Sequence, residues 1–231
     1  MRFSKNMKRS KIKDKDTKIS SPFDTKARKT ERTAVAILMS WMRNIIENKN
    51  LDLGLPDVEI STPGRRYPDL VIYETRRSQK VLCVIEAKPP HYDVFDEKEL
   101  KEPARKKATE LQAKYFCTTN FKTLIWYNTE KVNSGEPEEK QIIDKYNLSQ
   151  IENLDDIEQT RYSEPIKRAL EDFLTKLYAV ASGREPEPKI PIDEFLVFRL
   201  YEKIKRLSTY YRRIIEDQYH KDDKFAEKLK N

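Results

Sequence analysis

The sequence predicts an α/β domain in which a helix, three strands, a second helix and a fourth strand follow one another. The spacing of its apolar residues carries this prediction. In residues 30–48 and 98–116 they recur every three or four positions, as on amphipathic helices. Four short segments rich in β-branched and aromatic residues read as strands; they lie at 58–61, 68–73, 80–87 and 123–127. A C-terminal helical extension follows this core.

The first helix is expected over residues 30–48, because Val35, Leu38, Met42 and Ile46 fall on one face. The following strands are separated by turn-forming residues, with Thr62-Pro63-Gly64 after the first. Together these segments predict a helix followed by a meander of three strands.

The second helix is expected over residues 98–116, with Pro103 in its first turn, where a proline is tolerated. One face of this helix carries Ala104, Lys107, Ala108, Leu111 and Tyr115. The next segment, 123–127, is apolar throughout, which is typical of a central strand.

Further along, the polar and acidic residues 135–156 are expected to form loops, and helical spacing resumes over 164–181. Three parts are therefore predicted: a basic flexible tail at 1–28, a folded domain at 29–182, and a Pro-rich linker with a helical connector at 183–231. The prolines of 183–191 disfavour helix and strand alike. The last helix, expected from Asp193 to about Lys230, has a heptad-like seam of Val197, Leu200, Ile204, Leu207, Tyr211 and Ile214.

Charge is distributed unevenly along the chain. The net charge is +7, and the first 30 residues hold eleven Lys or Arg against three Asp or Glu, so the remainder is nearly neutral. Such a tail can contact phosphates, or it can be a solvated leader. Cys83 and Cys117 lie in apolar segments without metal-ligand spacing, and no apolar stretch is long enough to span a membrane. We expect a cytoplasmic protein.

Three residues in the strand meander carry the chemistry. Asp69 opens one strand, and Glu86 lies near the end of the next, so on adjacent antiparallel strands their carboxylates can converge. Strand alternation places Lys88 on the same face as Glu86. Carboxylate oxygens suit Mg²⁺ or Mn²⁺, and a nearby lysine can position an attacking water, as phosphodiester hydrolysis requires.

A structural reading of the same residues was also open. Asp69 can be a turn residue at the start of a strand, and Glu86 with Lys88 an exposed ion pair that adds little stability. The run Val81–Ala87 is too apolar for an exposed edge, which favours a functional reason for its carboxylate. The two histidines and four glycines leave little material for histidine-based catalysis or a Gly-rich phosphate loop.

Pro68-Asp69 followed by Glu86-Ala87-Lys88, in this order of helices and strands, resembles the PD-(D/E)xK nuclease superfamily over residues 30–128. The resemblance implies a restriction-endonuclease-like core, a four-stranded mixed sheet flanked by helices in the order αβββαβ. It implies that Asp69, Glu86 and the main-chain carbonyl of Ala87 bind Mg²⁺ or Mn²⁺ and that Lys88 is catalytic.

The resemblance extends to two further catalytic candidates. Glu31 opens the first helix, where the superfamily often carries a glutamate that faces the metal; it can equally be an acid that complements the helix dipole. Gln112 looks like the helix glutamine of RecB-like and type I restriction nucleases. The tyrosine expected four residues later is displaced, because Tyr115 follows after three and Phe116 after four.

The stretch around Arg65-Arg66-Tyr67-Pro68-Asp69 is similar to the N-terminal nuclease region of restriction-modification enzymes of the type I and type IIG kind. The resemblance implies DNA as substrate, with Arg65, Arg66 and His91 as candidate DNA contacts. It also implies a methyltransferase or recognition domain as partner, and the heptad-like seam adds a homodimer. A non-catalytic DNA-binding or assembly module, or a repair or recombination nuclease, are the alternative functions.

Overall fold

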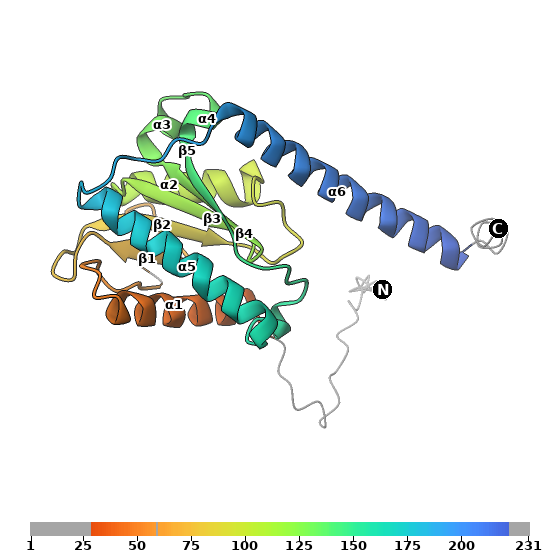
Figure 1. The fold of residues 1–231 in the computed structure, drawn as a ribbon, viewed down its shortest axis with the longest axis horizontal. Coiled ribbons are helices and arrows are strands. Elements are labelled where there is room, and N and C mark those ends of the chain that lie inside the picture. The colour runs from red at the N-terminus through yellow and green to blue at the C-terminus, as the bar shows by residue number, and fades with distance from the viewer. Residues whose placement is uncertain (1–28, 59, 222–231) are drawn as a thin grey trace, which may run out of the picture.

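The computed structural model describes residues 29–58 and 60–221, so the predicted basic tail lies outside the described residues. The fold is α/β, with a five-stranded mixed sheet between two helical layers (Figure 1). The strands are β1 (Leu70–Tyr73), β2 (Val81–Ala87), β3 (Tyr115–Thr119), β4 (Thr123–Asn128) and β5 (Ile142–Asn147). They lie side by side in chain order, and only the β2–β3 pair is parallel.

Two long helices cover one face of the sheet. These are α1 (Glu31–Asn48) and α5 (Thr160–Ala181), which lie side by side in Figure 1. Met42 and Phe173 from these helices are fully buried against strand residues such as Trp126. Burial of this apolar surface is the main driving force for packing the layer.

The opposite face is covered by shorter elements. A π-helical turn (Glu97–Lys101) runs into α2 (Glu102–Glu110), and Ala104 and Ala108 pack on this side of the sheet. The remaining short elements are α3 (Thr129–Asn133), α4 (Glu138–Gln141) and a 3₁₀ turn (Leu154–Asp156). Because side chains alternate along β2, Ile85 faces the α1 layer and Val84 the α2 layer, which puts Glu86 on the α2 side.

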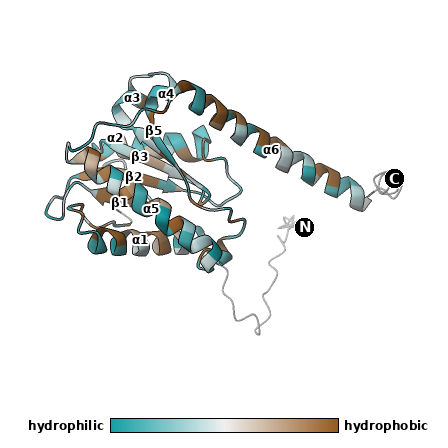
Figure 2. Cartoon of the chain, viewed as in Figure 1, coloured by the Kyte–Doolittle hydropathy of each residue, from teal (hydrophilic) through white to brown (hydrophobic). Residues whose placement is uncertain are grey.

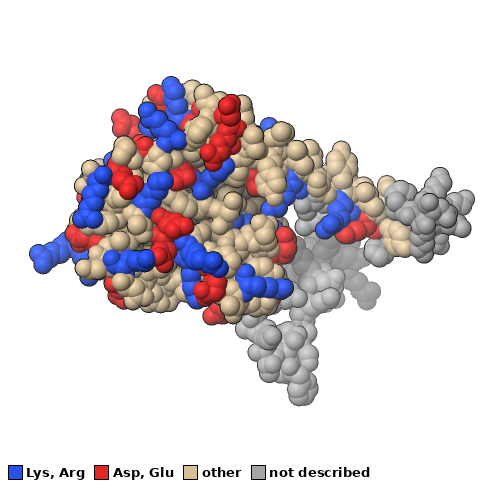
Figure 3. All heavy atoms as spheres, in the orientation of Figure 1, with Lys and Arg blue, Asp and Glu red and all other residues tan. Residues whose placement is uncertain are grey.

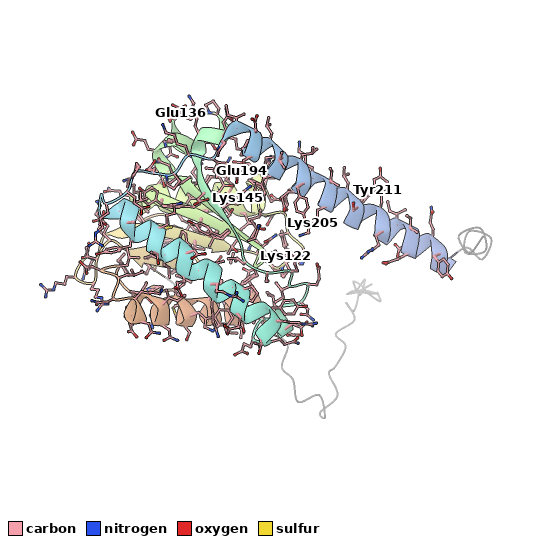
Figure 4. All side chains as sticks on the ribbon, viewed as in Figure 1. Lys122, Glu136, Lys145, Glu194, Lys205 and Tyr211 are labelled. Carbon is pink, nitrogen blue, oxygen red and sulfur yellow. The ribbon has the colours of Figure 1, made fainter. Side chains whose placement is uncertain are left out.

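The last helix, α6 (Ile192–Lys221), projects away from the body of the molecule (Figure 1). Phe195 and Phe198 at its start are buried against the α2 layer. Lys145 of β5 lies 3.6 Å from Glu194 in the same region, whereas Tyr211 lies on the projecting part (Figure 4). Bands of apolar residues continue along the projecting part (Figure 2). None of the described helices is long and apolar enough to cross a membrane.

The structure confirms most predicted elements and corrects three. Of the strand predicted at 58–61, the described residues 58, 60 and 61 are not in a strand; next to them, Asp57 makes a single bridge with Val71. The second helix ends at Glu110, and Tyr115–Thr119 form β3 instead of its last turn. The predicted loop 135–156 contains α4 and β5. The sheet therefore has five strands instead of four.

Candidate active site

The carboxylates of Asp69 and Glu86 are brought together by the pairing of β1 with β2. Leu70 pairs with Ile85 in this antiparallel register, so Asp69, directly before β1, lies opposite Glu86. The N–H of Ala87 donates to Oδ2 of Asp69 at 2.8 Å, which fixes the orientation of this carboxylate. The convergence predicted from the sequence is confirmed.

Glu86 is the most buried acid of this site, with 5% of its surface exposed. Lys107 of α2 donates from Nζ to both carboxylate oxygens, at 2.7 Å to Oε1 and 2.6 Å to Oε2. Burial and the charge of Asp69 nevertheless raise the pKa of Glu86 to about 7, against the opposing effect of Lys107. One ammonium does not fully offset the cost of burying a carboxylate beside another.

Lys88 lies one residue beyond the end of β2, and its N–H donates to the carbonyl of Thr119 at 2.9 Å. Its ammonium lies 3.5 Å from Oε1 of Glu31. Burial acts to lower the pKa of Lys88, but Glu31, Asp69 and Glu86 together raise it above its usual value. Lys88 is therefore surrounded by all three carboxylates.

Glu31 lies at the start of α1 and beside Lys88. It is the first residue of α1, directly after the N-cap Thr30, as expected of an acid at a helix N-terminus. Its carboxylate also faces Lys88. Burial raises the pKa of Glu31; the Lys88 ammonium opposes this effect, and the Asp69 charge adds to it. Asp69 lies opposite Glu86, and Glu31 lies 3.5 Å from Lys88, two residues along the chain from Glu86; we call these three acids the acidic site (Glu31, Asp69 and Glu86).

The other predicted site residues do not join the acidic site. Gln112 lies two residues after α2, exposed and with a φ of 54°, so its predicted place on a helix is wrong. Tyr115 belongs to β3 and donates to Glu187. His91 is exposed in a turn, with its ring against Tyr92.

The exposed Arg65 and Arg66 lie in the turn that leads into Asp69. Arg66 forms an ion pair with Glu110 at the end of α2. Thr62 and Gly64 also donate to this carboxylate, so Glu110 ties the turn to α2. Glu110 therefore holds Arg66 and the turn that carries both arginines.

Lys107 is the site residue that the sequence reasoning did not recognise. The helical spacing places Lys107 on one face with Ala104, Ala108 and Leu111. When such an apolar face is buried, a lysine within it needs a partner of opposite charge. That lone charge was the available signal. Its partner Glu86 is 21 residues away and reaches it only through packing of α2 on β2.

The donor set fits a hard divalent cation, because it consists of carboxylate oxygens with the adjacent carbonyl of Ala87. Among residues 29–58 and 60–221, no three acidic, His or Cys side chains are close enough together to hold a metal. The expected set of Asp69, Glu86 and a main-chain carbonyl holds only two such side chains. Lys88 and Lys107 pair with Glu31 and Glu86 in this arrangement.

Two surface depressions lie away from this site. One, about 340 Å³, involves Gly54 and Arg76; the other, about 740 Å³, involves Lys49 and Arg184. Neither includes a residue of the acidic site. On the face shown in Figure 3, basic and acidic side chains are interspersed, without a large field of one sign.

No protein-family model and no curated protein matches this sequence. Among solved structures, the chain is similar to the type IIG restriction endonuclease BpuSI, with 12% sequence identity and a TM-score of 0.45. The match covers 69% of this chain and only 18% of the length of BpuSI. This distant likeness concerns the fold alone.

Proposed function

We propose that this chain is a divalent-metal-dependent endonuclease module that hydrolyses phosphodiester bonds in DNA. The observation that carries the proposal is the meeting of Asp69, Glu86 and Lys88 at the ends of two paired strands. A buried acid whose pKa is raised by a second acid is uncommon in a purely structural role. The cluster also receives Glu31 from a separate helix, so three chain segments supply its acids.

Each residue has a task in this proposal. Asp69 and Glu86, with the carbonyl of Ala87, hold Mg²⁺ or Mn²⁺, which neutralises charge that develops on the scissile phosphate. Lys88 orients the attacking water and stabilises its loss of a proton, since its ammonium lies beside Glu31 and close to the proposed metal ligand Glu86 in sequence. Glu31 holds Lys88 in position through their ion pair.

Arg65 and Arg66 contact the DNA backbone in this proposal, because their turn leads directly into Asp69. Sequence recognition comes from elsewhere, such as a methyltransferase or recognition domain of a restriction-modification system. The near-neutral charge of the chain after residue 30 supports this division of labour, since an independent DNA binder is usually basic.

The test is cleavage of supercoiled plasmid with Mg²⁺ or Mn²⁺, using EDTA as a control. We expect Lys88→Ala to lower the nicking rate by at least ~100-fold and to leave metal binding, measured by calorimetry, largely intact. Asp69→Ala and Glu86→Ala should abolish both cleavage and metal binding. Lys80→Ala is the matched control, because Lys80 pairs with Glu74 on the exposed surface at the other end of β2. Retained cleavage in either carboxylate variant contradicts the assigned site.

A non-catalytic DNA-binding or assembly module is the second candidate. The observation that favours it is the ion pair that engages both oxygens of Glu86 with Lys107. This candidate predicts DNA binding without metal uptake. A protein that shifts DNA in a gel but shows no metal binding and no cleavage supports it over the nuclease.

A further inference from the structure

The pair of Lys107 and Glu86 suggests how the acidic site is kept in order before a metal binds. Lys107 is buried, with 8% of its surface exposed, and its Nζ lies within 2.7 Å of both oxygens of Glu86. An ammonium that engages both oxygens of Glu86 would compete with any metal that Glu86 holds, because both need the same oxygens.

The charge balance of the site also indicates that Lys107 and a divalent metal would compete for Glu86. When all three are ionised, the carboxylates of Glu31, Asp69 and Glu86 exceed the two ammoniums of Lys88 and Lys107 by one negative charge. A divalent cation added to this set gives a net positive charge, and the like charges of metal and ammonium repel strongly in a half-buried site. If Lys107 moves away, the metal balances the remaining charges.

The two lysines differ in the strength of their pairing. Lys88 lies 3.5 Å from a single oxygen of the half-exposed Glu31, whereas Lys107 makes two short hydrogen bonds to a buried acid. The neighbouring Lys106 pairs instead with Glu102, within α2 itself and on its exposed face. Of the two lysines of the site, Lys107 is the one that donates to both oxygens of a proposed metal ligand.

We propose that Lys107 is a placeholder cation, which holds the Glu86 carboxylate until a divalent metal displaces it. In the metal-free protein this ammonium offsets part of the cost of burying Glu86. When metal binds, Glu86 exchanges the ammonium for the metal, and Lys107 turns toward the open side of the site. This inference rests on the proposed function, because it requires that the site takes up a metal.

Calorimetric titration with Mn²⁺ tests the competition. We expect Lys107→Met to bind Mn²⁺ on the order of tenfold more tightly than the unmodified chain, since the competing charge is gone. Lys107→Gln, which keeps a donor to Glu86 without the charge, should show the same direction if the Met variant does not fold. Lys106→Met is the matched control and should leave the affinity unchanged. Equal or weaker binding in both Lys107 variants overturns the placeholder role.

A second measurement uses the unmodified chain. Acetylation of lysines by an N-hydroxysuccinimide ester, mapped by mass spectrometry, should be slow at Lys107 in EDTA and several-fold faster with saturating Mg²⁺. Lys106 serves as the internal reference. Unchanged labelling of Lys107 while calorimetry shows bound metal overturns the placeholder role alone. Absence of metal binding in every variant overturns the nuclease proposal and this inference together.

Discussion

Glu86 illustrates at the residue scale how burial and charge act against each other. It lies in a strand whose seven residues are all buried, where an ionised carboxylate loses its hydration. Lys107 restores two hydrogen bonds, and Asp69 adds repulsion. Because desolvation is the largest of these effects, the raised pKa of Glu86 is the net result.

This raised pKa predicts a pH-dependent stability. The folded chain keeps the Glu86 proton up to about pH 7, whereas a glutamate in the unfolded chain has its ordinary pKa of about 4.5 and loses the proton there. Between these values the folded state binds more protons, so the free energy of unfolding falls as the pH rises. We expect a loss of roughly 3 kcal/mol over this window in EDTA.

Urea denaturation at several pH values checks this prediction, with Glu86→Gln as the comparison. The variant lacks the titrating group, so its free energy of unfolding should depend less on pH. The difference in free energy of unfolding between the variant and the unmodified chain should therefore change with pH. Parallel profiles between pH 4.5 and 7 would show that Glu86 is ionised in the folded chain throughout.

How far the site can be predicted from sequence depends on the range of the contacts involved. Asp69 and Glu86 follow from local rules, because strand alternation and antiparallel pairing fix where they meet. Lys107 depends on how α2 packs, which no local rule gives. The prediction placed Gln112 on the helix, but α2 ends two residues earlier, at Glu110. Gln112 itself has a positive φ, a conformation that a glutamine in the sequence does not predict.

At the scale of elements, α2 supports the site through two residues of its C-terminal half. Lys107 reaches Glu86, and Glu110 accepts hydrogen bonds from Thr62 and Gly64 and an ion pair from Arg66. This carboxylate therefore holds the turn that precedes Asp69. Gly64 suits the contact, since a Cβ there would lie 2.6 Å from Oε1 of Glu110.

Glu110→Ala is expected to loosen this turn without disturbing α2 as a whole. We expect about 1 kcal/mol lower stability and faster hydrogen exchange at the amide of Gly64, which loses its acceptor. Glu102→Ala is the matched control, since Glu102 pairs only with exposed Lys106 on the same helix. Equal exchange at Gly64 in both variants would show that the turn is held by its own backbone.

The β5 and β3 strands could not be predicted because their sequence patterns do not distinguish them from a polar loop and from the end of a helix, respectively. The β5 strand begins with two buried isoleucines and continues with half-exposed polar residues, within a polar and acidic stretch. Its stability comes from pairing with β4 and from Tyr146 against Phe173 of α5. The β3 strand directly follows a short helix, so its aromatic residues extended the apparent helical spacing.

At the scale of the whole molecule, the linker and α6 are attached to the body by specific contacts. Glu187 accepts hydrogen bonds from Tyr115 and Asn128, and Lys131 pairs with it. Phe198 of α6 is buried, and Lys145 lies 4.0 Å from the centre of its ring. The start of α6 is therefore a fixed part of the fold.

The outward face of α6 is apolar where the helix projects from the body (Figure 2). Val197 and Ile204 alternate with Leu200 and Leu207 along it, at 53–68% exposure. β-branched residues alternating with leucine at heptad spacing favour a two-stranded coiled coil. We expect self-association through this face, seen as a dimer in sedimentation velocity at micromolar concentration.

Leu200→Glu with Leu207→Glu should return the chain to a monomer, because charged residues in the seam would be desolvated on pairing. Arg212→Glu is the control, since it introduces the same charge outside the seam. A monomer in the unmodified chain contradicts the prediction.

The acidic site and its lysines are collected from four places: Glu31 on α1, Asp69 before β1, Glu86 and Lys88 at β2, and Lys107 on α2. A fragment must extend from Glu31 to Lys107 to contain them all. Both helical layers must pack on the sheet before these groups meet. During synthesis on the ribosome, a nascent chain would therefore carry no competent cleavage centre until both layers had formed.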